Sequence, residues 1–183
     1  MQKKSVGLQL LSKNTNGELV AILQVRAKWN AEKNAPETFP GACQVTVHGK
    51  LEEGEDFIEA LLREVAEELG KEIVPHVQKL IDTQNLKELI TNQTPEKHVI
   101  TYGALVGTDI LNILINREVN DSFGGFKIIT QKEIAQIVDM KTIDKIEGVT
   151  DQKTIAMFPD EKQAVSRAFE LLFLITTPYF LSK

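Results

Sequence analysis

Residues 49–70, GKLEEGEDFIEALLREVAEELG, place eight acidic and two basic residues within 22 positions. This local charge of −6 exceeds the net charge of −5 carried by the whole chain, so the remaining sequence is nearly neutral. The acidity is therefore a local feature that needs its own explanation. Elsewhere no cluster of Lys and Arg predicts a basic face, and we expect no nucleic-acid partner.

The segment has the periodicity of a helix that is anchored on a core. Its apolar residues follow i, i+3, i+4, i+7 and i+11 spacing, which gives one continuous stripe. These residues are Ile58, Leu61, Leu62, Val65 and Leu69. At 3.6 residues per turn, Glu64, Glu67 and Glu68 gather on one flank, roughly 120° around the helix from that stripe.

Three glutamates in such proximity repel one another unless protons or a cation lie among them. Oxygen ligands on a rigid helix suit a hard divalent ion such as Mg²⁺ or Mn²⁺. The simpler interpretation is a solvated acidic face, in which Arg63 forms ordinary i, i+4 pairs with Glu59 and Glu67. The rest of the pattern favours the metal.

The charged and glycine positions of the segment follow a longer register: Gly49, Glu55, Arg63, Glu64, Glu67, Glu68 and Gly70, with the apolar Val65 inside it. This register closely resembles the signature of the Nudix hydrolases. The motif covers about an eighth of the 183 residues. The resemblance implies an α/β fold, the Nudix-like α/β/α sandwich, in which a mixed β-sheet is flanked by helices.

Patterns outside the motif agree with that fold. Strands are expected at residues 6–11, 18–28, 43–47, 72–82, 97–107 and 125–130, with an Asn16-Gly17 hairpin turn between the first two. Residues 29–42 are expected to form a polar loop, residues 131–140 a short amphipathic helix, and residues from about 160 a C-terminal helix that breaks at Pro178. We find no linker and expect residues 1–183 to form a single Nudix hydrolase domain.

The resemblance also implies roles for the motif residues. Metal ligands would be the Glu64, Glu67 and Glu68 side chains with the Gly49 carbonyl, and the ion would be Mg²⁺ or Mn²⁺. Catalytic roles fall to Glu67 as general base, to Glu55 at the start of the helix, and to Arg63, which orients a glutamate by an ion pair. The base is alternatively a carboxylate on a later loop, for which Glu118 and Asp121 are candidates, with Glu96 and Glu133 ranked lower.

The implied activity is a pyrophosphohydrolase that cleaves a diphosphate linkage in a nucleoside diphosphate derivative or related small molecule. One alternative is a catalytically silent binding or regulatory module with the same fold. Another is an enzyme similar to isopentenyl diphosphate isomerase, with Cys43 in the strand before the motif. The motif does not identify the substrate. Five aromatic residues either stack on a base or belong to the core: Trp29, Phe39, Tyr102, Phe123 and Phe126. His48 is either a structural loop residue or a residue that contacts the substrate.

The remaining expectations concern surroundings and partners. Cys43 is the single cysteine, so no internal disulfide forms. We expect its small side chain to be buried, and we expect the protein to be located in the reducing cytoplasm. The apolar run near the C-terminus is too short and too interrupted to span a bilayer. The last helix carries an apolar side, formed by Ala164, Ala168, Leu171, Leu172 and Ile175, that serves either the core or a homodimer interface.

Overall fold

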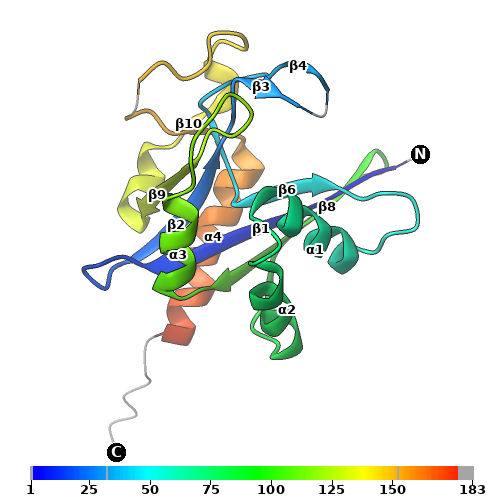
Figure 1. Ribbon diagram of the computed structural model, residues 1–183, viewed down its shortest axis with the longest axis vertical. Helices are drawn as coiled ribbons and strands as arrows, with labels where there is room; N and C mark the ends of the chain where they lie inside the picture. The colour runs from blue at the N-terminus through cyan, green and yellow to red at the C-terminus, as the bar shows by residue number, and fades with distance from the viewer. Residues whose placement is uncertain (1, 32, 152, 177–183) are drawn as a thin grey trace, which may run out of the picture.

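A mixed β-sheet lies at the centre of the computed structural model, with helices on both faces (Figure 1). The structure describes residues 2–31, 33–151 and 153–176. The strands of the sheet run in the order β5-β2-β1-β8-β7, with β6 also paired to β1 and β9 to β2. Their bounds are β1 Lys3–Lys13, β2 Leu19–Val25, β5 Cys43–Gln44, β6 Val47–Lys50, β7 Lys87–Gln93, β8 Lys97–Leu105 and β9 Phe126–Thr130.

The long strand β1 organises the sheet. It pairs in parallel with β8 and antiparallel with β2 and β6, while the β2–β9, β2–β5 and β7–β8 pairs are antiparallel. The register of the β1–β6 pair sets Val6 opposite Gly49 and Gly7 opposite His48. This pairing holds the beginning of the glutamate-rich segment at a fixed place on the sheet.

Three helices cover one face of the sheet: α1 (Phe57–Glu68), α2 (Val74–Asp82) and α3 (Thr108–Ile115). Their buried side chains join those of β1, β2 and β6 in one hydrophobic cluster, which includes Leu8, Leu61, Val65 and Val77. Burial of these apolar side chains is the main term that stabilises the fold.

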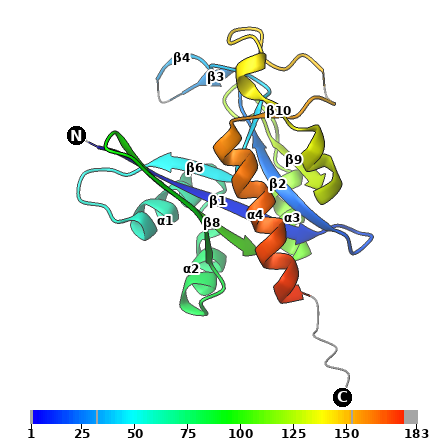
Figure 2. The same cartoon turned by 180° about the vertical axis from the view of Figure 1, so that it is seen from behind.

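The helix α4 (Pro159–Thr176) covers the opposite face, where it crosses β1, β7, β8 and β2 (Figure 2). Val165, Ala168, Phe169 and Leu172 of this helix pack on a second cluster beneath the sheet. Ala164, Ala168 and Leu172 are buried within the single chain, so this side of the helix belongs to the core.

Short elements complete the chain: β3 (Trp29–Asn30), β4 (Ala35–Pro36), β10 (Val138–Asp139), β11 (Ala156–Met157), and the 3-10 helices η1 (Gln131–Gln136) and η2 (Met140–Thr142). The expected loop at 29–42 therefore contains a small hairpin of β3 and β4. The helix expected at 131–140 is a 3-10 helix followed by a short strand.

The expected mixed sheet flanked by helices is confirmed, as are the first strand, the Asn16-Gly17 turn and the C-terminal helix. Pro178 lies outside the described residues. The strand expected at 72–82 is wrong, because this segment forms α2. Its proline, Pro75, stands in the first helical turn, where a missing N–H costs nothing. Ile73 and Val77, four residues apart, are both buried against the α1 face.

Candidate active site

The start of α1 is fixed by a capping box. The Asp56 carboxylate accepts hydrogen bonds from the backbone N–H groups of Ile58 and Glu59, and the Glu59 side chain accepts one from the Asp56 N–H. Glu55 therefore precedes the helix and its cap. The expectation that Glu55 begins the helix is wrong, because Asp56 is the better capping residue.

The apolar stripe of α1 sets the orientation of its acidic flank. Leu61, Val65 and Leu69 have no exposed surface, while Ile58 and Leu62 are half-buried at the edge of the stripe. Since these side chains fix the rotation of the helix on the sheet, the glutamates on its other flank face the β6 side, where α1 contacts that strand.

Arg63 lies within a cluster of glutamates that consists of Glu55, Glu64, Glu67 and Glu68. Its Nε and Nη2 bind both oxygens of Glu55 at 2.7 and 3.0 Å, and its Nη1 lies 2.9 Å from Glu64 Oε1. Nη2 also donates to the Lys50 carbonyl at 2.7 Å. Such bidentate, charge-assisted contacts fix geometry as well as adding energy. They lower the pKa of the Glu55 carboxyl and raise that of the Arg63 guanidinium.

Glu64 lies directly against the backbone of Gly49. A Cβ atom added at Gly49 would lie 1.7 Å from the Glu64 Cδ and 1.8 Å from its Oε1. The glycine is thus required by the close approach of a carboxylate rather than by its backbone angle. Burial raises the pKa of Glu64, against the opposing influence of Arg63. The structure brings these two motif positions, fifteen residues apart in sequence, into direct contact.

Glu68, at the end of α1, is half-buried. Its Oε2 accepts a hydrogen bond from the His48 backbone N–H at 3.1 Å, and the Gln24 side chain also bonds the carboxyl. Burial is the main reason that the pKa of Glu68 rises to about 8. The Arg117 guanidinium binds the backbone carbonyl of Glu68, which ties the end of α1 to the loop after α3.

Glu67 differs from its neighbours in being open to solvent. Its side chain is 59% exposed and its Oε1 lies 3.5 Å from Arg63 Nη1. The later-loop candidates Glu118 and Asp121 are exposed too, but neither lines the cavity that contains Glu68. Glu96 is exposed, and Glu133 accepts hydrogen bonds from Thr130 as the cap of η1. The structure therefore groups the motif residues, while Glu118 and Asp121 lie on the loop that Arg117 ties to the Glu68 carbonyl.

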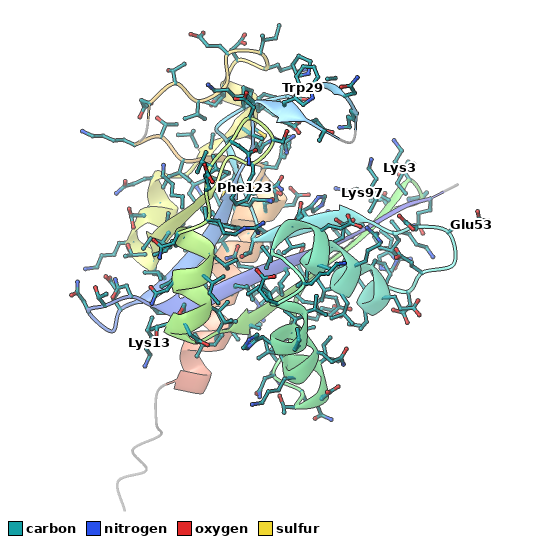
Figure 3. All side chains as sticks on the ribbon, in the orientation of Figure 1. Lys3, Lys13, Trp29, Glu53, Lys97 and Phe123 are labelled. Carbon is teal, nitrogen blue, oxygen red and sulfur yellow. The ribbon has the colours of Figure 1, made fainter. Side chains whose placement is uncertain are left out.

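A small cavity of about 220 Å³ adjoins this cluster; it is lined by Glu68, by strand residues that the sequence did not single out and by two of its aromatic candidates. Gln24 and Gln44 are joined by an amide hydrogen bond, and Arg26 Nη1 donates to the Gln44 Oε1 at 3.1 Å. Polar residues in strands have no distinctive spacing, so no sequence signal marked them. Trp29 of the β3–β4 hairpin and Phe123 of the loop before β9 also line this cavity. Both side chains are labelled in Figure 3.

Three of the other candidates from the sequence, Phe39, Tyr102 and Cys43, take part in core packing. Phe39 is buried in the third cluster with Met140, and Tyr102 packs on the α1 face. Cys43 is 1% exposed, and burial raises the pKa of its thiol to about 11, as expected for a core side chain and not for a reactive group.

The donor set of the cluster fits a hard divalent cation. All of its side-chain donors are carboxylate oxygens. Glu64 is buried, Glu68 is half-buried, and both carboxyls have raised pKa values. In the part of the chain that the structure describes, no three His, Cys, Asp or Glu side chains are already arranged as a set of metal ligands. Two of the carboxylates are held by other partners: Glu64 Oε1 by Arg63 Nη1 and Glu68 Oε2 by the His48 N–H.

Comparison with protein families agrees with this geometry. The family model described as NUDIX domain matches residues 2–142, which is most of the chain. The chain belongs to the Nudix family. This match includes the whole glutamate-rich segment and all of the sheet. The family assignment supports a Nudix hydrolase, and enzymes of this kind typically use divalent metal ions.

Solved structures show the same fold. A mutT/nudix family protein from Listeria innocua is 19% identical, with a TM-score of 0.58 over 95% of this chain and 98% of that one. A MutT/nudix family protein from Enterococcus faecalis is 15% identical, with a TM-score of 0.55 over 94% of this chain and 62% of that one. The comparison with curated proteins finds no match. No helix within the described residues is long and apolar enough to cross a membrane.

Proposed function

We propose that this protein is a divalent-metal-dependent hydrolase that cleaves the phosphoanhydride of a nucleoside diphosphate derivative or related small molecule. One observation carries the proposal. All motif carboxylates are present; Glu55, Glu64 and Glu67 contact one arginine beside the end of β6, and Glu64 packs against Gly49. A solvated acidic helix would have no need for that contact or for the Glu55–Arg63 pair.

In this proposal Mg²⁺ or Mn²⁺ is held by the carboxylates of Glu64, Glu67 and Glu68 and by the Gly49 carbonyl. The ion, when bound, supplies positive charge against the diphosphate oxygens and acidifies water for attack on phosphorus. Arg63 acts as a positioning residue, since it touches Glu55, Glu64 and Glu67 and neutralises part of their mutual repulsion.

Glu67 is proposed as the general base because it is the most exposed carboxylate of the cluster. An exposed carboxylate can take a proton from water and release it to solvent. Glu118 and Asp121 remain the alternatives for this role, on the loop after α3 that Arg117 ties to the Glu68 carbonyl. The proposal treats residues 1–183 as one domain, since α4 packs on the same sheet as the motif, and a cytoplasmic location stays a prediction.

The test is a turnover screen with Mg²⁺ or Mn²⁺ over nucleotide sugars, nucleoside triphosphates, ADP-ribose, dinucleoside polyphosphates and prenyl diphosphates. Chromatography should follow both products of each reaction, because cleavage of a nucleotide sugar or ADP-ribose gives two phosphomonoesters and no free phosphate. Wild type should turn over at least one compound, and Glu67→Gln should lower kcat by about 10²-fold or more. Glu170→Gln, at an exposed glutamate on α4, is the matched control and should retain full activity.

Two outcomes would contradict the proposal. Full activity in Glu67→Gln would remove Glu67 as the base and point to the later loop. No turnover of any compound by folded wild-type protein would favour the silent binding module. The isomerase alternative gains no support from the structure, because the Cys43 thiol is buried.

A further inference from the structure

Three hydrogen-bonded side chains, Arg26, Gln44 and Gln24, form a polar row that ends at the glutamate cluster. The β2–β5 register sets Gln24 directly opposite Gln44, and side chains opposite one another in an antiparallel pair lie close enough to bond. Arg26 Nη1 donates to Gln44 Oε1 at 3.1 Å, and the Gln44 amide donates to the Gln24 oxygen. The Gln24 amide in turn bonds the Glu68 carboxyl.

Arg26 holds the outer end of the polar row. Its Nη2 lies 2.7 Å from Glu37 Oε1, and its Nε donates to the Thr38 carbonyl at 2.9 Å. Asn30 donates to the other oxygen of Glu37 at 2.9 Å. The Arg26 and Glu37 side chains are only 20% and 12% exposed, so water has little access to this pair. Hydrogen bonds are stronger in such surroundings than at an open surface, and the guanidinium is therefore held in one place.

The guanidinium sets the direction of each bond in the polar row. Since a guanidinium only donates, the oxygen of Gln44 faces Arg26. The NH₂ group of Gln44 is then left for the oxygen of Gln24, which leaves the NH₂ group of Gln24 for Glu68. An ionised carboxylate only accepts, so both ends of the polar row require the same orientation of the two amides.

Glu68 thus accepts hydrogen bonds from two donors, the Gln24 side chain and the His48 backbone N–H. An ionised carboxylate has about four acceptor sites, so two bonds fix its orientation and leave the remaining sites for a cation. Groups that bond a metal ligand without touching the metal commonly change metal affinity by about 10- to 100-fold.

We propose that Arg26, Gln44 and Gln24 are positioning residues for the divalent metal, and that they act by orienting the Glu68 carboxylate. The inference rests on the proposed function, because it takes Glu68 as a metal ligand. All three residues lie outside the motif of residues 49–70. The competing explanation is that the polar row only fastens β5 to β2, in which case any side chain at position 44 that keeps the bond from Arg26 would serve equally well.

Calorimetry with Mn²⁺ alone, without substrate, distinguishes the two explanations. Gln24→Met removes the donor to Glu68 and should weaken Mn²⁺ binding by about tenfold. Gln44→Glu is the decisive variant, because a carboxylate keeps the bond from Arg26 but offers only acceptors to Gln24. Gln24 must then turn its oxygen toward Glu68, so Mn²⁺ binding should again weaken by about tenfold. Gln163→Glu adds the same charge at an exposed position on α4 and should change binding by less than about twofold.

A double variant tests whether the effect of Gln44→Glu passes through Gln24. In the Gln24→Met background, Gln44→Glu should change Mn²⁺ affinity by less than about twofold, because no amide remains to be turned. Wild-type affinity in Gln44→Glu would overturn the inference. An equal loss in both backgrounds would overturn it too, because the loss would then come from the added charge. Circular dichroism and thermal melting establish that each variant is folded.

The failure of the proposed function is a separate result. Wild-type protein that binds Mn²⁺ and responds to these substitutions as expected, but turns over no compound, would retain the polar row and lose the hydrolase. Turnover by wild type together with unchanged Mn²⁺ affinity in Gln44→Glu would retain the hydrolase and overturn the positioning role. A wild-type protein that binds no Mn²⁺ would overturn both.

Discussion

Replacing Gly49 by alanine should damage the glutamate cluster far more than the fold. The added Cβ would lie 1.7 Å from the Glu64 Cδ and 2.2 Å from its Cγ, whereas ordinary contacts begin at 3.4 Å. The Glu64 carboxylate must therefore move by about 2 Å, because the Gly49 backbone is held in the β1–β6 pair. This displacement breaks the 2.9 Å bond between Glu64 Oε1 and Arg63 Nη1.

The energetic consequence can be bounded from these contacts. A charge-assisted hydrogen bond contributes about 1.5–3 kcal/mol, and part of that is recovered because the displaced carboxylate is better hydrated. We expect Gly49→Ala to lower the free energy of unfolding by about 1–2 kcal/mol. Misplacing a ligand by this distance should lower kcat/KM by about 10²-fold or more.

The assay is a double-mutant cycle by urea denaturation with Gly49→Ala, Glu64→Ala and the double variant. In the Glu64→Ala background the clash is gone, so Gly49→Ala should cost less than about 0.5 kcal/mol. An equal cost of Gly49→Ala in both backgrounds would refute the reasoning, because the damage would then come from the strand and not from Glu64. Full activity of Gly49→Ala would refute the role of this contact in the site.

Three further predictions concern the same region and its surroundings. Millimolar Mg²⁺ or Mn²⁺ should raise the melting temperature of wild type in differential scanning fluorimetry, and an unchanged melting curve would contradict a metal site. Arg63→Gln leaves the Glu55 and Glu64 carboxylates without their cation and should cost about 1–3 kcal/mol in urea denaturation, whereas Arg167→Gln, at an exposed pair, should cost less than about 0.5 kcal/mol. Burial lets the folded state hold the proton of Glu161, in the first turn of α4, up to about pH 8, while the unfolded chain releases it near 4.5. The stability of wild type relative to Glu161→Gln should thus fall by up to a few kcal/mol between these pH values, and a constant difference would show that Glu161 titrates normally.

The helix α1 is the element that sequence periodicity predicted best. The buried positions Leu61, Val65 and Leu69 follow from spacing alone, because a helix puts such residues on one face whatever it packs against. The first strand and its turn could also be predicted from the sequence, since Asn16-Gly17 between apolar runs is a local signal.

Other elements were predicted wrongly or missed. The segment of α2 was predicted as a strand, although Ile73, Val77 and Ile81 lie four residues apart, which is helical spacing. The helix α3 was not predicted, although Ile110, Leu111 and Leu114 lie at helical spacing and are buried. Strand β7 was missed as well, because only its alignment with β8 makes the polar sequence of Lys87–Gln93 a strand.

The sequence by itself determined the glutamate cluster, since Glu64, Glu67 and Glu68 share a helical flank through local geometry. Only the tertiary structure decided that Glu64 packs on Gly49, that Gln24 reaches Glu68, and that Glu161 lines a cavity on the α4 face. The physical reason is the separation in sequence over which each kind of contact is determined. Backbone periodicity orders neighbours within a few turns, whereas contacts between separate strands and helices depend on the sheet register and on which apolar faces are buried together.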